Sequence, residues 1–255
     1  MDRSAAVEVS EDENEVSQVL LCNPRGASAR ISLHGGQVRS WKTERGEDLL
    51  FTSSKANLNP PAAVRGGIPI CFPKFGNQVS VEQHGFVRNR MWIIDENPAP
   101  LQSIDSSTGI ASIDLVYKST DADLRFWPHR FELRLRVILS VDGSLTLISR
   151  VRNVDSKPFT FAFAYHTYFS IGDIRYRWGS RSGGKEDFCD KKKGLPDVVV
   201  WNPWDQKSKT IPDFGKDEYK FMLCVDAAAI ENPITLKPGE EWTGQVEFSV
   251  TSLKY

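Results

Sequence analysis

The chain has 255 residues, of which 32 are Lys or Arg and 33 are Asp or Glu. This even balance gives no electrostatic reason to expect nucleic acid or an anionic membrane as a partner. The length suits one large β domain, so we expect residues 1–255 to form a single domain. The polar first residues lack the apolar core of a signal peptide, and no apolar run could cross a bilayer, which predicts a cytoplasmic protein.

Short runs that alternate apolar with polar residues and end at turn formers indicate strands along the chain. The clearest run is Phe131–Leu139, in which every second residue is apolar. Val141, Asp142 and Gly143 then predict a tight turn into the next strand. The predicted strands, in chain order, are 29–33, 37–41, 109–117, 131–139, 144–151, 159–166, 197–201, 219–225 and 242–250.

Helical signal is limited to a turn or two at 53–57 and 195–199. No strand–helix–strand alternation is present, which argues against a doubly wound nucleotide-binding fold. The four cysteines form no C-x-x-C pair, so we expect neither a metal site nor a disulfide framework. The pattern predicts an all-β fold made of antiparallel sheets.

An irregular segment rich in glycine and proline separates the second and third predicted strands. It carries Arg65, Gln83, His84 and Arg88. Loops on a rigid β scaffold often hold binding groups, and two arginines could give the forked donors that suit a phosphate. The alternative is that these arginines lie on the surface and pair with acids.

The predicted strand 159–166 has two different faces. Its odd positions are aromatic, whereas its even positions are small residues that end at His166. We expect the aromatic face to lie in the core and the other face to leave room for a ligand beside the imidazole. His166 is therefore a candidate acid, since an unperturbed imidazole titrates near neutral pH. The alternative is a structural histidine at a strand end.

A later apolar run, 222–225, delivers the carboxylate of Asp226 at its end, and Glu231 follows. From the spacing alone, either acid could simply end a strand.

Six motifs in order carry a resemblance to a known family. They are L-x-G-G-Q-V-x-S-W (33–41), R-G-G-I-P-I-C-F-P-x-F-G (65–76), E-Q-H-G-F-x-R-N (82–89), A-Y-H-T-Y-F (164–169), L-P-D-x-V-V-W-N-P-W (195–204) and L-K-P-G-E-x-W (236–242). Together they cover nearly the whole chain, which resembles the glucose-6-phosphate 1-epimerases of the aldose-1-epimerase superfamily, above all the plant members.

The resemblance implies a galactose-mutarotase-like supersandwich, a hexose 6-phosphate substrate, and no cofactor or metal. His166 matches the family's acid, and Asp226 stands where the wider family more often has a glutamate base. Arg65, Gln83 and Arg88 match substrate-binding positions, with His84 beside them, and the arginines are the expected phosphate ligands. We expect a monomer that binds a small sugar phosphate.

The implied reaction needs one proton given to the ring oxygen of a pyranose and another taken from its anomeric hydroxyl. We therefore predict that His166 and Asp226 face each other across a sugar ring without a direct ion pair. Arg65 and Arg88 should lie close enough to share one phosphate. The shorter side chain of Asp226 could weaken the activity.

The chain departs from its family after residue 174. The family continues through several strands, whereas here only the bridge 175–193 precedes the Gly-Leu-Pro-Asp motif. The bridge shows no apolar alternation and is predicted to be a loop, which leaves the sandwich incomplete around 170–194. Residues 185–192 can be encoded by a base sequence that, when translated one nucleotide later, gives Lys-Arg-Thr-Phe-Val-Ile-Arg, which resembles the family at this point. We therefore hypothesise that the bridge is translated out of frame, through a splice variant or a gene-model error.

Three functions are compared. The first is interconversion of the α and β anomers of a hexose 6-phosphate. The second is a catalytically impaired or inactive protein that binds sugar phosphates. The third, a mutarotase for neutral sugars, is disfavoured because it gives Arg65 and Arg88 no anion.

Overall fold

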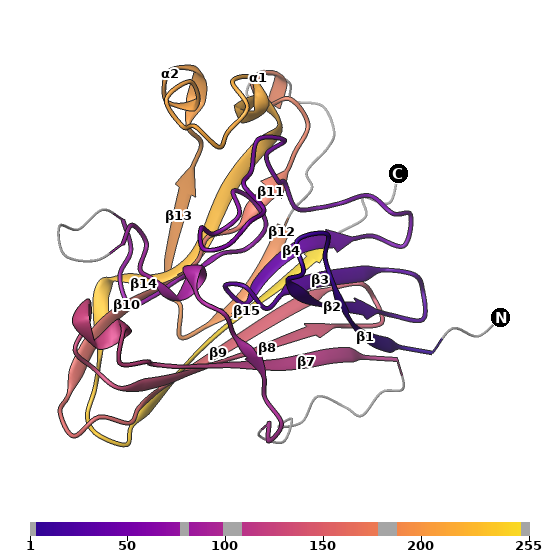
Figure 1. Cartoon of the computed structure of the whole chain (residues 1–255). Coiled ribbons are helices and arrows are strands. Elements are labelled where there is room, and N and C mark those ends of the chain that lie inside the picture. Colours follow the sequence, from indigo (N-terminus) through magenta and orange to yellow (C-terminus); the bar gives the residue numbers. More distant parts are fainter. Residues whose placement is uncertain (1–3, 77–81, 99–108, 178–187, 251–255) are drawn as a thin grey trace.

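The computed structural model describes residues 4–76, 82–98, 109–177 and 188–250. These residues form three antiparallel sheets with only short helices, so the all-β prediction is confirmed. Figure 1 shows three strands of the six-stranded sheet along the bottom of the molecule and the four-stranded sheet on the right above them, with two short helices, α1 (Ile174–Arg177) and α2 (Trp204–Ser208), at the top.

The strands are ordered within each sheet as follows. The four-stranded sheet runs β1 (Ala6–Glu11), β2 (Ser17–Cys22), β3 (Ser28–Ser32) and β4 (Gln37–Lys42). The five-stranded sheet runs β11 (Tyr168–Ser170), β14 (Met222–Leu236), β10 (Phe159–Tyr165) and β5 (Ile70–Cys71), with β13 (Asp197–Trp201) also paired to β14. The six-stranded sheet runs β12 (Phe188–Lys193), β15 (Glu241–Val250), β9 (Leu145–Asn153), β8 (Phe131–Leu139), β7 (Ala111–Lys118) and β6 (Ile93–Ile94).

Strand β8 shows why the alternating pattern works. Its apolar residues are buried, and its charged residues reach the other face, where Arg136 pairs with Asp114 on β7 at 2.8 Å. The predicted turn at Val141–Gly143 joins β8 to β9, with Leu139 opposite Leu145. All three sheets contribute to one apolar core, to which Trp41, Leu135 and Phe163 belong, for example.

The structure corrects some sequence-based boundaries. The strand predicted at 219–225 begins only at Met222, as β14, and residues 219–221 lie instead in a 3₁₀ turn (Glu218–Phe221). Strand β14 then runs much further than predicted. At 53–57 the structure has a single turn, in which the N–H of Ala56 donates to the carbonyl oxygen of Ser53 at 3.0 Å, and no helix is formed there. The expected helical turn at 195–199 is absent because 197–199 belong to β13, and short helices occur instead at α1 (Ile174–Arg177) and α2 (Trp204–Ser208). Within the described ranges, no helix has the length and apolar character needed to cross a membrane.

The described ends of the bridge 175–193 are not the loop that its composition predicted. Its last six residues form β12, which pairs with β15 from Phe188 opposite Val250 to Lys193 opposite Gln245. Backbone hydrogen bonds to an existing strand can hold a charged segment that has no apolar alternation, and lysines are common on edge strands. Lys191 adds an ion pair with Glu247 at 3.0 Å. Residues 178–187 of the bridge lie outside the described part of the chain.

Candidate functional site

His166 and Asp226 lie opposite each other on neighbouring segments. The chain leaves β10 at Tyr165 and enters β11 at Tyr168, and these two residues pair with Ala227 and Cys224 of β14. The register therefore brings His166 against Asp226. The aromatic residues of β10 are buried in the core, whereas the imidazole lies on the other face, as predicted.

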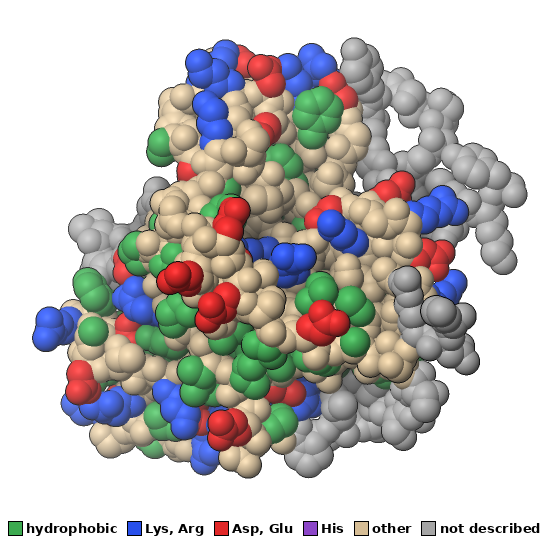
Figure 2. Space-filling model, turned by 45° about the vertical axis from the view of Figure 1, so that its right-hand side comes forward, with side chains coloured by type: hydrophobic (Ala, Val, Ile, Leu, Met, Phe, Trp, Pro, Cys, Tyr) green, Lys and Arg blue, Asp and Glu red, His purple; other side chains and the backbone are tan. Residues whose placement is uncertain are grey.

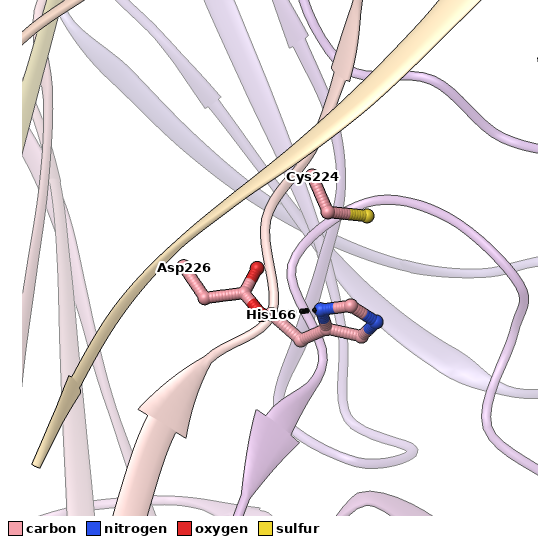
Figure 3. Close-up of side chains that lie close together, drawn as sticks. All are labelled: His166, Cys224 and Asp226. Carbon is pink, nitrogen blue, oxygen red and sulfur yellow. Dashed lines mark hydrogen bonds and ion pairs between the residues drawn. The ribbon is translucent and has the colours of Figure 1, made fainter. Parts of the chain in front are cut away.

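The two side chains make a direct hydrogen bond. His166 Nδ1 lies 2.8 Å from Asp226 Oδ2 (Figure 3), and the other carboxylate oxygen accepts the backbone N–H of Thr167 at 3.1 Å. The expectation that a sugar ring would separate the pair is therefore wrong. The reason is that two strands paired in register hold opposite side chains within contact distance.

Burial dominates the electrostatics of this pair. The carboxyl group of Asp226 is fully buried, and this burial raises its pKa, because a low-dielectric environment disfavours the ion. The hydrogen bonds from His166 and Thr167 act in the opposite direction. A carboxylate in this position holds the imidazole in one orientation and leaves Nε2 as the nitrogen that can exchange a proton.

His84 stacks on His166, with ring centroids 5.4 Å apart. Its backbone is left-handed, with a φ of 61°. The next residue must be glycine, because a Cβ on Gly85 would lie 1.9 Å from the carbonyl oxygen of Phe72. This close approach ties the 82–90 loop to the segment that follows β5.

His84 is a neutral imidazole of defined tautomer. Burial lowers its pKa to about 3, helped by the positive charges of Arg88, His166, Arg65 and Lys207. Its Nδ1 accepts the backbone N–H of Gly76 at 3.2 Å, so the proton is assigned to Nε2. His84 can therefore donate a hydrogen bond to a ligand oxygen.

The other predicted binding residues differ in their surroundings. Gln83 is exposed, and no described residue hydrogen-bonds its side chain. Arg88 lies in a 3₁₀ turn (Val87–Asn89), and its buried Nε has no hydrogen-bond partner among the described residues. Arg65 is engaged: Nη2 lies 3.2 Å from Asp213 Oδ1, and Nη1 donates to the hydroxyl of Tyr168 at 3.3 Å.

Arg65 and Arg88 act on the same two rings. Both guanidinium groups help lower the pKa of His84, and both oppose the rise in the pKa of Tyr168 that burial causes. They therefore lie around a common region beside His166. One edge of the Arg65 guanidinium group is paired with Asp213. For Arg65, the alternative that these arginines pair with acids is therefore met in part.

Sequence reasoning missed several residues of this region. The ring of Trp201 lies 6.0 Å from that of His166, and Lys207 Nζ lies 5.8 Å from the Trp201 ring centroid. Asp213 and Lys207 sit in or beside the short α2 segment, where no periodicity marks them. Trp201 belongs to the W-N-P-W motif, which is the signal that could have found it.

Cys224 is the third group at the pair. Its Sγ and one ligand atom each from His166 and Asp226 all lie within 4.8 Å of one another (Figure 3). Burial raises the pKa of the Cys224 thiol well above its usual range, so the sulfur is protonated at neutral pH.

A cavity of about 470 Å³ lies among other loops and is lined by none of these residues. Its lining carries both signs of charge, with Arg25 and Glu44 paired at 3.5 Å. Its lining has no histidine and no buried acid–base pair, so the candidate functional site is the one at His166, where proton-transfer groups converge.

The chain matches a known protein family over most of its length. Residues 17–178 and 184–249 match the sequence model of a family described as Aldose 1-epimerase. A "Putative glucose-6-phosphate 1-epimerase" of Cenchrus ciliaris is 43% identical over 298 aligned positions, which take in 99% of this chain and 90% of that protein. A protein of the same name from Escherichia coli (strain K12) is 26% identical, with 84% of each chain covered.

Solved structures show the same fold. A "putative mutarotase" from Salmonella typhimurium superposes with a TM-score of 0.74 at 21% identity, over 96% of both chains. Galactose 1-epimerase from Lactobacillus acidophilus NCFM gives 0.69 at 14% identity, over 96% of this chain and 98% of that one. The expected galactose-mutarotase-like fold is confirmed.

The comparisons also bear on the bridge. The alignment with the Cenchrus ciliaris protein runs over 298 positions although this chain has 255 residues, so that protein has residues that this chain lacks. The family match is interrupted between 178 and 184, inside the bridge.

Proposed function

Because the chain belongs to the aldose 1-epimerase family, we propose that it interconverts the α and β anomers of a hexose 6-phosphate, glucose 6-phosphate first. One observation carries this proposal: a buried His–Asp pair lies beside His84, around which Arg65, Arg88 and Lys207 place positive charge. A proton-transfer group next to cations suits a reaction on a phosphorylated sugar.

His166 acts as the acid in this proposal. The imidazolium gives its Nε2 proton to the ring oxygen, the bond from that oxygen to the anomeric carbon breaks, and the anomeric hydroxyl loses its proton as the aldehyde forms. The aldehyde turns about the C1–C2 bond, and the hydroxyl attacks its other face and returns its proton to His166. The carbonyl oxygen takes back a proton from water and becomes the new anomeric hydroxyl. No net proton is gained or lost.

Asp226 acts through His166 rather than from the opposite side of the sugar. Its Oδ2 already holds Nδ1 at 2.8 Å, so in this geometry it orients the imidazole and stabilises the imidazolium. Water then takes the anomeric proton. Catalysis from one side only would make the enzyme slower than one with an opposed acid and base.

The remaining groups bind the substrate. His84 offers its Nε2 proton to a sugar oxygen, and Gln83 lies exposed next to it for a hydroxyl. Arg88 Nε is a buried donor without a protein partner among the described residues, which an anionic oxygen would satisfy. Arg65, held by Asp213 and Tyr168, keeps its charge near the same region.

The direct test follows the optical rotation of freshly dissolved α-glucose 6-phosphate, with α-glucose as the comparison sugar. We expect the protein to accelerate mutarotation of the phosphorylated sugar above the buffer rate. Arg88→Ala should weaken binding of the 6-phosphate by about 1.5–3 kcal/mol, as for a lost hydrogen bond to a charged group. Binding of α-glucose should change little.

Two outcomes would redirect the proposal. Equal affinity for glucose and glucose 6-phosphate in the wild type would remove the arginines from phosphate binding. Saturable binding of the 6-phosphate without any acceleration would instead identify a sugar-phosphate-binding protein. Under the proposed function the partner is a small sugar phosphate and the protein is a monomer, which light scattering would check.

A further inference from the structure

The thiol of Cys224 lies against the His166–Asp226 pair and has no part in the proposed reaction. Cys224 and Asp226 are two residues apart on β14, so their side chains point to one face, and the turn between β10 and β11 brings His166 onto that face (Figure 3). We propose that these three side chains form a binding site for a soft divalent cation, Zn²⁺ or Cd²⁺, whose occupation blocks the enzyme.

The donor set suits such an ion. An imidazole nitrogen, a thiolate sulfur and a carboxylate oxygen are ligands of Zn²⁺, and three protein ligands leave a fourth position open for water. Ligand atoms around a tetrahedral Zn²⁺ stand roughly 3–4 Å apart, given bonds of about 2.0–2.3 Å. The three atoms here already lie within 4.8 Å of one another, so small side-chain rotations would complete the site.

Charge balance also favours a divalent ion. All three side chains are buried, and Asp226 is fully so. A thiolate and a carboxylate carry two negative charges, which a +2 ion neutralises without leaving a net buried charge. On binding, the S–H bond of Cys224 breaks and its proton goes to solvent. The proton on His166 Nδ1 moves through solvent to Nε2, so the imidazole remains neutral and its Nδ1 lone pair is free for the metal.

Inhibition follows from this change at His166 and rests on the proposed function. With Nδ1 bound to the metal, the imidazole can no longer become the imidazolium that Asp226 stabilises. Metal binding itself does not depend on the reaction, since it follows from the placement of the three ligands.

The binding test uses Cd²⁺, because a cadmium–thiolate bond gives an ultraviolet charge-transfer band. The protein used for this test carries the substitutions Cys22→Ser and Cys189→Ser, so that Cys71 and Cys224 are its remaining thiols. We expect one equivalent of Cd²⁺ to produce the band, and Cys224→Ser to abolish it. Cys71→Ser is the matched control, since Cys71 is equally buried, lies on β5 of the same sheet, and is outside the trio.

A second measurement covers the case in which Cys224→Ser does not fold. Calorimetric titration with Zn²⁺ should give a dissociation constant for His166→Gln that is at least about tenfold higher than for the wild type. Even the loss of a residue that only hydrogen-bonds to a metal ligand weakens metal binding by about that factor. An unchanged band in Cys224→Ser, or no saturable binding by the wild type, would overturn the metal site. A band in a protein that shows no mutarotase activity would instead refute the proposed function and leave the site standing.

Discussion

The contact between His166 and Asp226 decides what each residue can do. A 2.8 Å hydrogen bond fixes the imidazole and leaves only Nε2 for chemistry, and the raised pKa of Asp226 reflects how deeply that carboxyl group is buried. The proposed reaction therefore depends on one nitrogen atom, and the residue that carries it is the first to test.

We expect His166→Asn to lower the mutarotation rate by about 10²–10⁴-fold, the range that a positioned acid or base contributes. Affinity for the 6-phosphate should stay within about twofold, because the cationic side chains are untouched. Polarimetry and calorimetry measure the two quantities. His129→Asn is the control, since that imidazole packs on Trp127 and Phe159, away from the site. Unchanged mutarotation in His166→Asn would remove the histidine from the mechanism.

Lys207 should contribute to phosphate affinity as an exposed positive charge at the edge of the site. Its Nζ lies over Trp201, and it is one of the cations that lower the pKa of His84. We expect Lys207→Ala to weaken 6-phosphate binding by about 1 kcal/mol, and less at high salt. Lys209→Ala, on the same turn of chain but paired with Asp205 at 2.8 Å, is the matched control. Equal losses of 6-phosphate affinity in both variants would show that Lys207 acts only through general electrostatic attraction and not at a specific position.

Sequence patterns located these residues unequally. Alternation along 159–166 correctly separated the core face from the face that ends at His166. It could not give the distance to Asp226, because that distance depends on the register between strands 60 residues apart in the chain. Lys207 lies in the short helix α2 and Asp213 in the loop after it, where no periodicity distinguishes a site residue from a solvated one.

At the scale of elements, β14 organises the site. It pairs with β10 and β11 along one edge and with β13 along the other, so its residues 224–228 lie between strands. The ladder with β10 is interrupted between Phe161 and Phe163, where β14 bulges. Asp197, the first residue of β13, supports this bulge by accepting the backbone N–H groups of Ile230 and Glu231 at 2.7 and 3.0 Å.

This contact should make the strand pair sensitive to acid. The N–H donors of Ile230 and Glu231 lower the pKa of Asp197, so the folded state favours the carboxylate. The stabilisation is fully present above about pH 5 and is lost as the pH falls below about 4 and through the lowered pKa. We expect Asp197→Asn to melt at a lower temperature than the wild type at pH 7, with the difference shrinking toward pH 3.

Thermal unfolding across that pH range measures the effect. Glu231→Gln changes the neighbouring carboxylate, which makes no part of this contact, and serves as the control. A difference between wild type and Asp197→Asn that stays constant with pH would show that the ionised carboxylate is not what supports the bulge.

Element boundaries were predictable where burial alternates and unpredictable where backbone pairing alone decides. Strands β8 and β13 match their predicted ranges. Strand β12 was missed because nothing in Phe188–Lys193 alternates, and its order comes from the hydrogen-bonding edge that β15 presents.

At the scale of the whole molecule, one apolar core draws on all three sheets, while the surface at and after β13 exposes apolar side chains. Figure 2 shows acidic and basic side chains interspersed on one face, together with hydrophobic ones. Val198, Val200 and Trp204 expose 50%, 63% and 54% of their surface, and among the described residues β13 pairs with β14 alone. Exposed apolar residues on an edge strand favour self-association. If the additional residues of the Cenchrus ciliaris relative fill the break in the family match, they lie in the segment that precedes β13.

We therefore expect that replacing residues 175–193 with the corresponding longer segment of the Cenchrus ciliaris protein will raise both stability and mutarotation rate. Extra strands would bury apolar surface and pair an open edge, and each buried Å² is worth about 25 cal/mol. Differential scanning fluorimetry and polarimetry of the two chains give the comparison. A Gly-Ser segment of the same added length is the control, since it supplies length without strands. If the graft melts no higher than that control, the shortened bridge is not a defect, and the chain is complete as a sandwich in its present form.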